Sequence, residues 1–351
     1  MKENLAILGS TGSIGTNTLE VISKHKDKYK VFALSANSSV DLLLSQCQKF
    51  EPNFVHISDS NHLKKIKISL EKLNLSTQII SGSSELNELV GNEKVDTVVC
   101  GISGSAGLES SLQAVKSGKK ILLANKEPLV MCGSLFMEMA DRYKSQILPV
   151  DSEHNALHQC FSANEDKLIS KIILTASGGP FLNTPLKEFN NITLAEALKH
   201  PTWVMGPKIS IDSATMMNKG LEIIEAMHLF SFKAEQIEVM IHPQSVVHSM
   251  VCYGDGSIIA QLSQNDMKIP ISYCLGWPKR IDSGVGSLNL INQPPLDFLD
   301  VSKERYPCFF LAKNIAKEGD SFPIVMNAAN EVAVEAFLNG KVKFKDIHSV
   351  I

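Results

Sequence analysis

Runs of apolar residues alternate with stretches of helical spacing through the first 150 residues of the chain. The run at residues 5–8 leads into a glycine-rich turn, after which Leu19 and Ile22 mark one face of a helix. Further runs of strand length, separated by helical stretches such as 60–73, lie at residues 30–36, 54–57, 78–80, 95–100 and 120–124. Strands that alternate with helices form a parallel sheet covered on both faces. The pattern therefore predicts an α/β fold that begins with a Rossmann-like, doubly wound parallel sheet.

The second half of the chain has a different pattern. A strand-like run at 171–176 ends in a glycine turn, and two more runs, 238–241 and 257–262, are followed or preceded by turn residues. A tight Gly254-Asp255-Gly256 turn before the last run predicts a hairpin, and we expect an antiparallel sheet beside helices. Residues 282–295 are rich in Gly, Ser, Asn and Pro and are expected to be a linker. Two helical patterns, 306–318 and 323–339, come last; Asn327, Asn330 and Glu331 are expected to be surface residues of the second.

The composition is that of an ordinary globular protein. The chain has 351 residues, of which 44% are hydrophobic and 20% charged, so it is long enough for two or three domains. A formal net charge of −3 gives no electrostatic case for nucleic acid or an anionic membrane surface as a partner. Local basic residues can still bind a small anion.

The cysteines and the N-terminus indicate a cytoplasmic protein. Seven cysteines are scattered without a CxxC pair, which argues against a disulfide framework or a zinc knuckle. The first residues lead directly into a strand, which leaves no room for a signal peptide, and no apolar run reaches the length of a membrane span. We therefore expect a cytoplasmic location and no membrane partner.

The glycine turn at residues 9–15 is typical of a dinucleotide-binding unit. Gly9, Gly12 and Gly15 follow a predicted strand and open a predicted helix, the context in which such a turn binds phosphate. The spacing is GxxGxxG rather than GxGxxG, and a glycine turn without a ligand is the alternative. No acidic residue follows the next strand at positions 37–39, which favours NADP over NAD.

Polar residues also follow the predicted strand at 120–124. Asn125, Lys126 and Glu127 lie where ligands gather in parallel sheets, at the carboxyl end of a strand. An ion pair on the surface between Lys126 and Glu127 is the alternative interpretation.

The stretch PVDSEHN at residues 149–155 suggests a metal site. If residues 147–152 are extended, Asp151 and Glu153 point to one side and Ser152 to the other. Paired carboxylates suit a hard divalent cation such as Mg²⁺ or Mn²⁺. Alternatively, Asp151 or Ser152 caps a helix over 153–164. His154 and His158 could indicate zinc, but their EHxxxH order lacks a third spaced ligand.

Three later stretches contain candidate substrate residues. Ser177 begins a glycine turn whose amides can bind an anion, or which is simply a turn. Trp203 and Met205 lie in a Pro- and Gly-punctuated stretch, 200–208, that suggests a lid over a substrate, with ordinary core packing as the alternative. If the chain is helical from residue 214 onward, Asn218 and Glu222 share one face, which could be a ligand site or a solvated surface.

Taken together, these segments resemble the 1-deoxy-D-xylulose 5-phosphate reductoisomerase family. The resemblance runs in order through nearly the whole chain and rests on GSTGSIGTNTL, ANKEPLV, PVDSEHNA, TASGGPF, HPTWVMGPKISIDSATMMNKGLEIIEA and IHPQSVVHSMV. It implies an enzyme of the non-mevalonate isoprenoid pathway that uses NADPH and a divalent metal (Mg²⁺, Mn²⁺ or Co²⁺). The implied reaction rearranges 1-deoxy-D-xylulose 5-phosphate and reduces the product to 2-C-methyl-D-erythritol 4-phosphate. A homodimer is also implied.

The resemblance assigns the site residues by motif. For the cofactor it implies Thr11, Gly12, Ser13, Ile14, Asn125, Glu127 and Gly206. For the metal it implies Asp151, Glu153 and Glu222, which with Lys126 are the catalytic residues. For the phosphate end of the substrate it implies Ser177, Ser213, Asn218 and Lys219. For the rest of the substrate it implies Lys126, Ser152, Glu153, His200 and Glu222.

The expected domains follow from the patterns and the resemblance together. They are an NADPH-binding domain at 1–149, a central α+β catalytic and dimerisation domain at 150–281, a linker at 282–300 and a small C-terminal helical domain at 301–351. The chain stops at Ile351, where members of the family usually continue, so a shortened third domain is expected. Ser38 and Ser39 replace the basic residue and Asn often found there, which makes a non-catalytic NADP-binding sensor the competing hypothesis.

Overall fold

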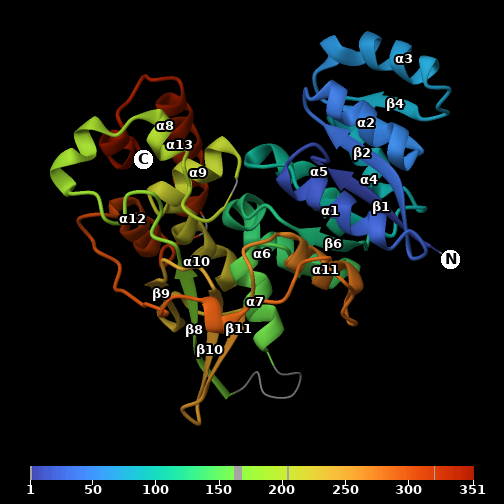
Figure 1. Cartoon of the computed structure of the whole chain (residues 1–351). Coiled ribbons are helices and arrows are strands. Elements are labelled where there is room, and N and C mark those ends of the chain that lie inside the picture. Colours follow the sequence, from blue (N-terminus) through green and yellow to red (C-terminus); the bar gives the residue numbers. More distant parts are fainter. Residues whose placement is uncertain (1, 162–167, 204, 320) are drawn as a thin grey trace. The chain divides into compact units, whose positions relative to one another are not determined.

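The computed structural model describes residues 2–161, 168–203, 205–319 and 321–351 (Figure 1). The chain forms two compact units. The first comprises the chain up to Pro128, Leu135–Asp151 and Met267–Val285, and the second comprises Leu129–Ser134, Ser152–Asp266 and Gly286–Ile351. No helix in these described ranges is long and apolar enough to span a membrane.

The first unit contains a seven-stranded sheet in the order β4-β3-β2-β1-β5-β6-β7, in which every neighbouring pair is parallel. Its strands are β1 (Glu3–Leu8), β2 (Tyr29–Ala36), β3 (Phe54–Ile57), β4 (Gln78–Ser81), β5 (Thr97–Cys100), β6 (Lys120–Leu123) and β7 (Gln146–Pro149). The order reverses beside β1, which is the point where doubly wound sheets bind ligands. The Rossmann-like prediction is confirmed.

Helices alternate with these strands as the sequence pattern predicts. They are α1 (Ser13–Lys24), α2 (Val40–Phe50), α3 (Leu63–Lys72), α4 (Ser83–Gly91), α5 (Leu108–Lys116), α6 (Glu127–Tyr143) and α11 (Lys268–Gly276). On α1, the buried residues Thr18, Leu19 and Ile22 have helical spacing and join a core with Leu5 and Ile7 of β1. The central strands are apolar on both sides because helices cover both faces of a parallel sheet.

Helix α11 belongs to the first unit, although the sequence placed it in the predicted catalytic domain at 150–281. It packs on α1, β6 and β7. The carbonyl of Leu275 accepts hydrogen bonds from Tyr29 Oη at 3.1 Å and from Lys120 Nζ at 2.7 Å, and the Cys274 thiol lies 3.1 Å from the carbonyl of Pro149. Tertiary contacts therefore give the compact units a boundary that differs from the predicted one; the functional division remains a prediction.

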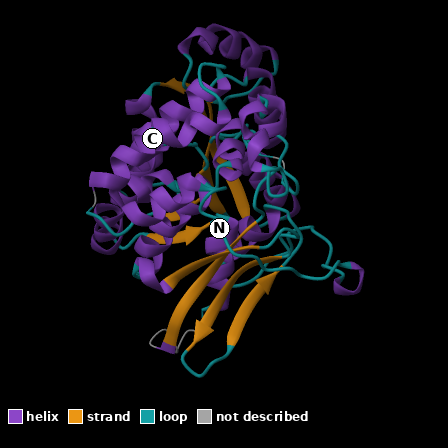
Figure 2. Cartoon of the chain, turned by 90° about the vertical axis from the view of Figure 1, so that its left-hand side faces the viewer, coloured by secondary structure: helices purple, strands orange, loops and turns teal. Residues whose placement is uncertain are grey.

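The second unit contains a four-stranded sheet in the order β11-β10-β8-β9, whose strands are drawn in orange in Figure 2. The strands are β8 (Ile169–Ala176), β9 (Ile237–Ile241), β10 (Val247–Tyr253) and β11 (Ile258–Leu262). The predicted β10–β11 hairpin is confirmed, but the sheet is not entirely antiparallel because β8 and β9 are parallel. Several helices lie between β8 and β9 in the chain, and such a crossover returns the strand in the same direction.

The helices of the second unit surround a core that includes the inner face of its sheet. They are α7 (Ser152–Cys160), α8 (Leu194–Ala197), α9 (Pro207–Ala214), α10 (Met217–Phe230), α12 (Pro307–Ile315), α13 (Ser321–Leu338) and α14 (Ile347–Val350). Leu174, Leu221 and Phe309 belong to one buried cluster, so strand β8, helix α10 and the C-terminal helix α12 share a core. Asn327 and Asn330 on α13 are fully buried, so their expected place on the helix surface is wrong.

Candidate functional site

The glycine turn after β1 leaves the first turn of α1 open to a ligand. Gly9 has φ +73°, and a Cβ there would lie 2.6 Å from the carbonyl oxygen of Gly101. A Cβ on Gly15 would lie 2.3 Å from Cα of Ser10, so the helix approaches its own turn closely. The predicted cofactor residues Thr11, Gly12, Ser13 and Ile14 lie at this N-terminus. Gly12 and Ser13 are exposed, and amides at such a position bind phosphate.

The residues after β6 are buried, which contradicts the alternative of a surface ion pair. Asn125, Lys126 and Glu127 are all less than 7% exposed, and the ammonium group of Lys126 lies 2.6 Å from Asp151 Oδ2. Both amide atoms of Asn125 are buried and have no hydrogen-bond partner within the described ranges. Because buried polar atoms in native proteins are normally paired, this amide suits a polar ligand.

The geometry predicted for residues 147–152 is wrong in part. Strand β7 ends at Pro149 and helix α7 begins at Ser152, so Ser152 and Glu153 are helical rather than extended. The Ser152 hydroxyl donates to Glu153 Oε2 at 2.6 Å. The end of the predicted helix at 162–164 lies outside the described residues.

Helix α10 brings its predicted polar residues together inside the second unit. The ammonium group of Lys219 lies 2.9 Å from Glu153 Oε1 and 2.5 Å from Glu222 Oε2. The Asn218 amide donates to the other carboxylate oxygen of Glu222 at 2.5 Å. Lys219 and Glu222 are buried, so the alternative of a solvated helix surface is wrong. The pairing of positions four apart on α10 is confirmed.

Carboxylate oxygens of Asp151, Glu153 and Glu222 all lie within 4.8 Å of one another. Asp151 directly precedes Ser152 in the chain and comes from the end of β7, whereas Glu222 comes from α10. Three carboxylate oxygens are the donor set that hard cations such as Mg²⁺ and Mn²⁺ prefer. The predicted metal residues are therefore brought together, and their chemistry fits the predicted ion.

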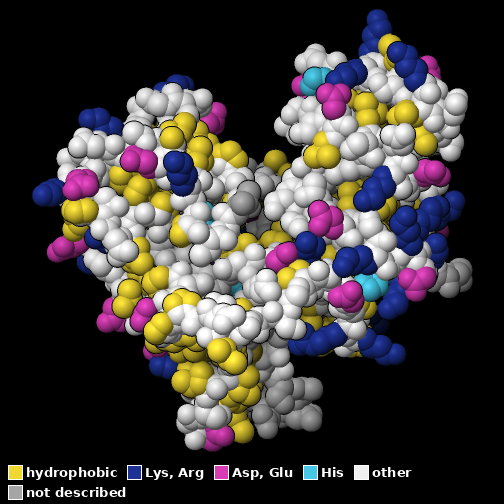
Figure 3. Space-filling model, viewed as in Figure 1, with side chains coloured by type: hydrophobic (Ala, Val, Ile, Leu, Met, Phe, Trp, Pro, Cys, Tyr) yellow, Lys and Arg dark blue, Asp and Glu magenta, His cyan; other side chains and the backbone are white. Residues whose placement is uncertain are grey.

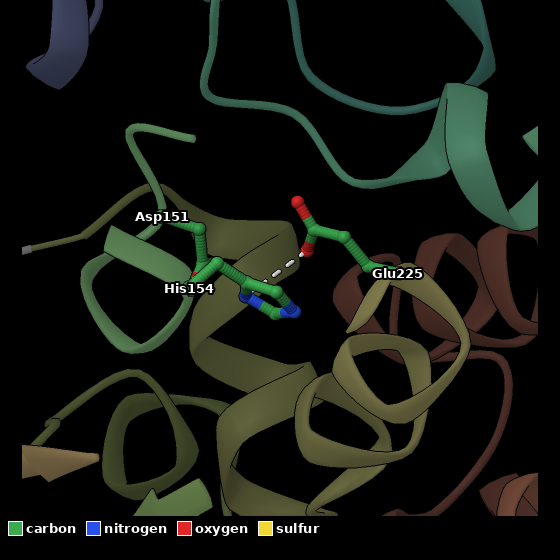
Figure 4. Close-up of side chains that lie close together, drawn as sticks. All are labelled: Asp151, His154 and Glu225. Carbon is green, nitrogen blue, oxygen red and sulfur yellow. Dashed lines mark ion pairs between the residues drawn. The ribbon is translucent and has the colours of Figure 1, made fainter. Parts of the chain in front are cut away.

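The buried imidazole of His154 contacts the backbone of Glu222, one of the three carboxylate residues. His154 Nε2 is 3.0 Å from the carbonyl oxygen of Glu222, so this nitrogen carries a proton and donates. Its Nδ1 is 3.5 Å from Glu225 Oε2. Figure 4 shows this ion pair together with Asp151. Both side chains are fully buried. In the described parts of the chain, His154 forms a group of three candidate metal ligands with Asp151 and Glu225, but no such group includes His158, so the zinc alternative that pairs the two histidines is not supported.

The Ser177 turn and His200 form a second polar cluster in the second unit. The amides of Thr202 and Trp203 donate to His200 Nδ1 at 3.2 and 3.0 Å, and Nε2 lies 2.9 Å from Ser177 Oγ. Burial, with the nearby charge of Lys219, lowers the pKa of His200 to about 4, so the ring is neutral at pH 7. Nε2 then carries the proton and donates to Ser177 Oγ, which also accepts from the Gly179 amide at 3.1 Å.

Two accepted hydrogen bonds leave the hydroxyl hydrogen of Ser177 available to donate elsewhere. An anionic oxygen is a suitable acceptor for it. The Ser177 turn can therefore bind an anion as well as reverse the direction of the chain.

The predicted lid residues lie before helix α9. The ring of Trp203 is 6.1 Å from that of His248, a buried residue of β10 whose pKa burial lowers to about 4. Val204 lies outside the described residues. Gly206 is exposed as the N-cap of α9 and Ser213 lies near the end of that helix. Gly206 belongs to the second unit, and its part in cofactor binding stays a prediction.

The sequence patterns give no role to several residues that surround these clusters, which are Glu225, His248, Arg305 and Tyr306. His154 is predicted only as an alternative zinc ligand, and Asn330 only as a surface residue. The only local signal was the helical spacing of Glu222 and Glu225 on α10, because the other partners come from distant parts of the chain.

Comparison with known proteins gives one consistent result. Family models described as 1-deoxy-D-xylulose 5-phosphate reductoisomerase, its C-terminal domain, and the DXP reductoisomerase C-terminal domain match residues 5–133, 147–230 and 262–351. The chain is 49% identical to 1-deoxy-D-xylulose 5-phosphate reductoisomerase of Saccharophagus degradans over 353 residues, covering 99% of this chain and 90% of that protein. The protein of the same name from Ruthia magnifica is 48% identical over 349 residues, with coverage of 99% and 90%.

Solved structures agree with the sequence comparisons. A DOX-P reductoisomerase in complex with NADPH, fosmidomycin and magnesium has a TM-score of 0.96 and 47% identity, and covers 99% of this chain and 87% of that one. The enzyme from Zymomonas mobilis in complex with NADPH has a TM-score of 0.92 and 43% identity, covering 99% and 90%.

Proposed function

The chain belongs to the 1-deoxy-D-xylulose 5-phosphate reductoisomerase family, and we propose that it rearranges 1-deoxy-D-xylulose 5-phosphate and reduces the product with NADPH. The product is 2-C-methyl-D-erythritol 4-phosphate, in the non-mevalonate isoprenoid pathway. The observation that carries this proposal is the convergence of Asp151, Glu153 and Glu222 within 4.8 Å, beside the ammonium group of Lys219.

These three carboxylates would bind Mg²⁺, Mn²⁺ or Co²⁺. A divalent cation supplies a Lewis acid, which stabilises negative charge on substrate oxygens while the carbon skeleton rearranges. The chain fixes two of these ligands from different helices: Glu153 lies on α7, and Glu222 lies on α10 with Asn218 and Lys219 against its carboxylate. Lys126, which lies against Asp151, is proposed to contact the substrate.

The phosphate end of the substrate would be bound by hydroxyl, amide and ammonium groups. The free hydroxyl hydrogen of Ser177 and the side chains of Ser213, Asn218 and Lys219 are the proposed donors. His200 stays neutral at pH 7 and orients Ser177 rather than adding charge. Ser152 and Glu153 would contact the rest of the substrate.

NADPH would bind to the first unit. The amides of residues 11–14 suit its phosphates, and the buried Asn125 amide offers an acceptor and a donor that no described residue uses. Glu127 and Gly206 are proposed to lie near the cofactor as well. Residues 200–208 are the proposed lid, which would exclude water when it closes.

Turnover that depends on a divalent metal is the test of this function. Purified protein with 1-deoxy-D-xylulose 5-phosphate and Mn²⁺ is expected to oxidise NADPH. The oxidation is measured as the loss of absorbance at the nicotinamide band. Removal of the metal with EDTA is expected to abolish turnover because the Lewis acid is lost, and added Mg²⁺ or Mn²⁺ should restore it. NADPH binding, followed by cofactor fluorescence, should survive EDTA. Cofactor binding without turnover under any of these conditions would favour the NADP-binding sensor instead.

We further propose that the protein is a homodimer that pairs through β11, and that it is cytoplasmic. Strand β11 is an edge strand, and Ile258, Ile259 and Leu262 on it are 58%, 45% and 36% exposed. Figure 3 shows hydrophobic side chains gathered where β10 and β11 lie in Figure 1. An apolar edge strand favours pairing with a second copy.

The cytoplasmic location is supported by the seven cysteines, which are all free thiols and so suit a reducing compartment. Cell fractionation can check it.

The dimer is tested by light scattering on an Ile259→Lys variant. The wild type is expected to have about twice the chain mass of 38.4 kDa, and a charge on the edge strand should weaken the dimer at least about tenfold. Ile68→Lys on α3, where the isoleucine is 43% exposed, is the matched control and should leave the dimer intact. A monomeric wild type, or a dimer unaffected by Ile259→Lys, would contradict this surface.

A further inference from the structure

The residue that precedes helix α12 contacts the turn that contains Ser177. Tyr306 immediately precedes α12 and is 1% exposed, and its hydroxyl donates to the carbonyl of Gly178 at 2.7 Å. Gly178 and Gly179 both have positive φ, at +81° and +67°, a region that residues with a Cβ rarely adopt. The backbone of the turn therefore has few other conformations once the Gly178 carbonyl is bound. Tyr306 therefore fixes the backbone of the turn at the residue that follows Ser177.

The neighbouring arginine fixes the continuation of the same turn. Nη1 of Arg305 donates to the carbonyl of Phe181 at 2.6 Å and to that of Thr184 at 2.7 Å. Its guanidinium group also lies over the ring of Phe189, 5.4 Å from the centroid. The planar donor group of an arginine suits two carbonyls at once.

A residue of α13 fixes the second segment, helix α9, next to Ser213. The carboxylate of Asp212, which is 1% exposed, accepts from the Asn330 amide at 2.9 Å and lies 2.8 Å from Lys208 Nζ. Helix α9 and the turn also contact each other, because a Cβ on Gly179 would lie 2.9 Å from the carbonyl oxygen of Ser213. The C-terminal region thus contacts both segments that present a proposed phosphate ligand.

We propose that Arg305, Tyr306 and Asn330 are positioning residues for the phosphate end of the substrate. They set the distance between the hydroxyl groups of Ser177 and Ser213 without touching the substrate. A binding group must be held within about 0.5 Å of its productive place, so loosening either segment weakens phosphate binding. This inference rests on the proposed function, because that function assigns Ser177 and Ser213 to the phosphate.

A Tyr306→Phe variant tests the turn. It removes one hydroxyl group and keeps the ring, so KM for 1-deoxy-D-xylulose 5-phosphate is expected to rise about 5- to 10-fold. The value of kcat should stay within about twofold, because the phosphate lies away from the reacting carbons and its loss of binding is uniform. KM for NADPH should not change.

The matched control is Tyr253→Phe. Tyr253 is also buried, 6% exposed against 1% for Tyr306, and its hydroxyl donates to the carbonyl of Cys160 at 3.0 Å, likewise a backbone acceptor in the second unit. Both variants should lose a similar amount of thermal stability, but only Tyr306→Phe should raise KM. An equal rise in both, or none in Tyr306→Phe, overturns the inference.

Two further variants keep the test decisive if Tyr306→Phe does not fold. Arg305→Lys keeps the charge and should raise the same KM. Asn330→Ala should do so as well, whereas Asn327→Ala should not, since the Asn327 amide donates to Glu331 at 3.2 Å within its own helix. Unchanged KM in both Arg305→Lys and Asn330→Ala overturns the inference.

If the proposed function is wrong, the wild type does not turn over the pentulose phosphate at all. This result differs from a change of KM in the variants, which tests the inference. Titration calorimetry with inorganic phosphate then decides the inference by itself: wild type and Tyr253→Phe should bind it, and Tyr306→Phe should bind it about 5- to 10-fold more weakly. Equal phosphate affinity in all three, or none in the wild type, overturns it.

Discussion

A Glu222→Gln variant is expected to lose at least about 10³-fold in kcat while it still binds NADPH. Glu222 is fully buried, and its two carboxylate oxygens lie 2.5 Å from the Asn218 amide and the Lys219 ammonium group. An amide in its place keeps the shape but removes the charge that a divalent cation and Lys219 both require. Steady-state kinetics give kcat, and titration with Mn²⁺ measures the accompanying loss of metal affinity.

Two comparisons make this result specific. Glu235→Gln removes the same charge from an exposed position of the same unit and should leave kcat and metal affinity unchanged. Cofactor fluorescence should give the same NADPH affinity for both variants, because the proposed cofactor residues of the first unit are untouched. Normal turnover by Glu222→Gln would remove Glu222 from the proposed metal site.

A Glu225→Ala variant is expected to lower the free energy of unfolding by about 3–5 kcal/mol. The carboxylate of Glu225 faces Nδ1 of His154 at 3.5 Å, and both side chains are fully buried. Nε2 of His154 donates to the carbonyl of Glu222, so the imidazole has to keep its orientation. Removing the carboxylate leaves a buried polar ring facing a cavity. Urea unfolding, followed by circular dichroism, measures the change.

The matched control is Glu235→Ala, which should cost no more than about 0.5 kcal/mol because the position is exposed. Glu225→Gln separates charge from volume. If the charge of the carboxylate matters, glutamine is nearly as destabilising as alanine; if filled space matters, glutamine restores most of the stability. A loss below about 1 kcal/mol for Glu225→Ala would show that the pair does not stabilise helices α7 and α10.

Features with a local cause could be predicted from the sequence. The turn after β1 needs residues that tolerate positive φ and close approach, and Gly9 and Gly15 meet both needs. The contact between Asn218 and Glu222 follows from positions four apart on a helix. The approach of Asp151 to Glu153 was predicted for the wrong reason, since the strand that was to align them ends at Pro149.

Features that depend on distant partners could not be predicted in this way. Asn330 looked like a surface residue because its partner, Asp212, lies 118 positions earlier in the chain. The sequence of helix α11 does not predict which elements it packs against. Residues 270–275 are all buried, so the helix has no polar face that would distinguish its solvent side from its core side. Helical periodicity reveals which face of a helix is buried, but not which layer buries it.

The packing of α11 also determines when the first unit can be completed during synthesis. The chain passes from one unit to the other after Pro128, Ser134, Asp151, Asp266 and Val285, so neither unit is a continuous segment. When β7 leaves the ribosome, the parallel sheet still lacks the helix that covers β6 and β7. Residues Ser152–Asp266 of the other unit must be translated before that helix emerges. Helix α11, which contains Cys274, is therefore synthesised long after the sheet that it covers. Until it is made, the nascent sheet has an uncovered apolar surface that a chaperone would recognise.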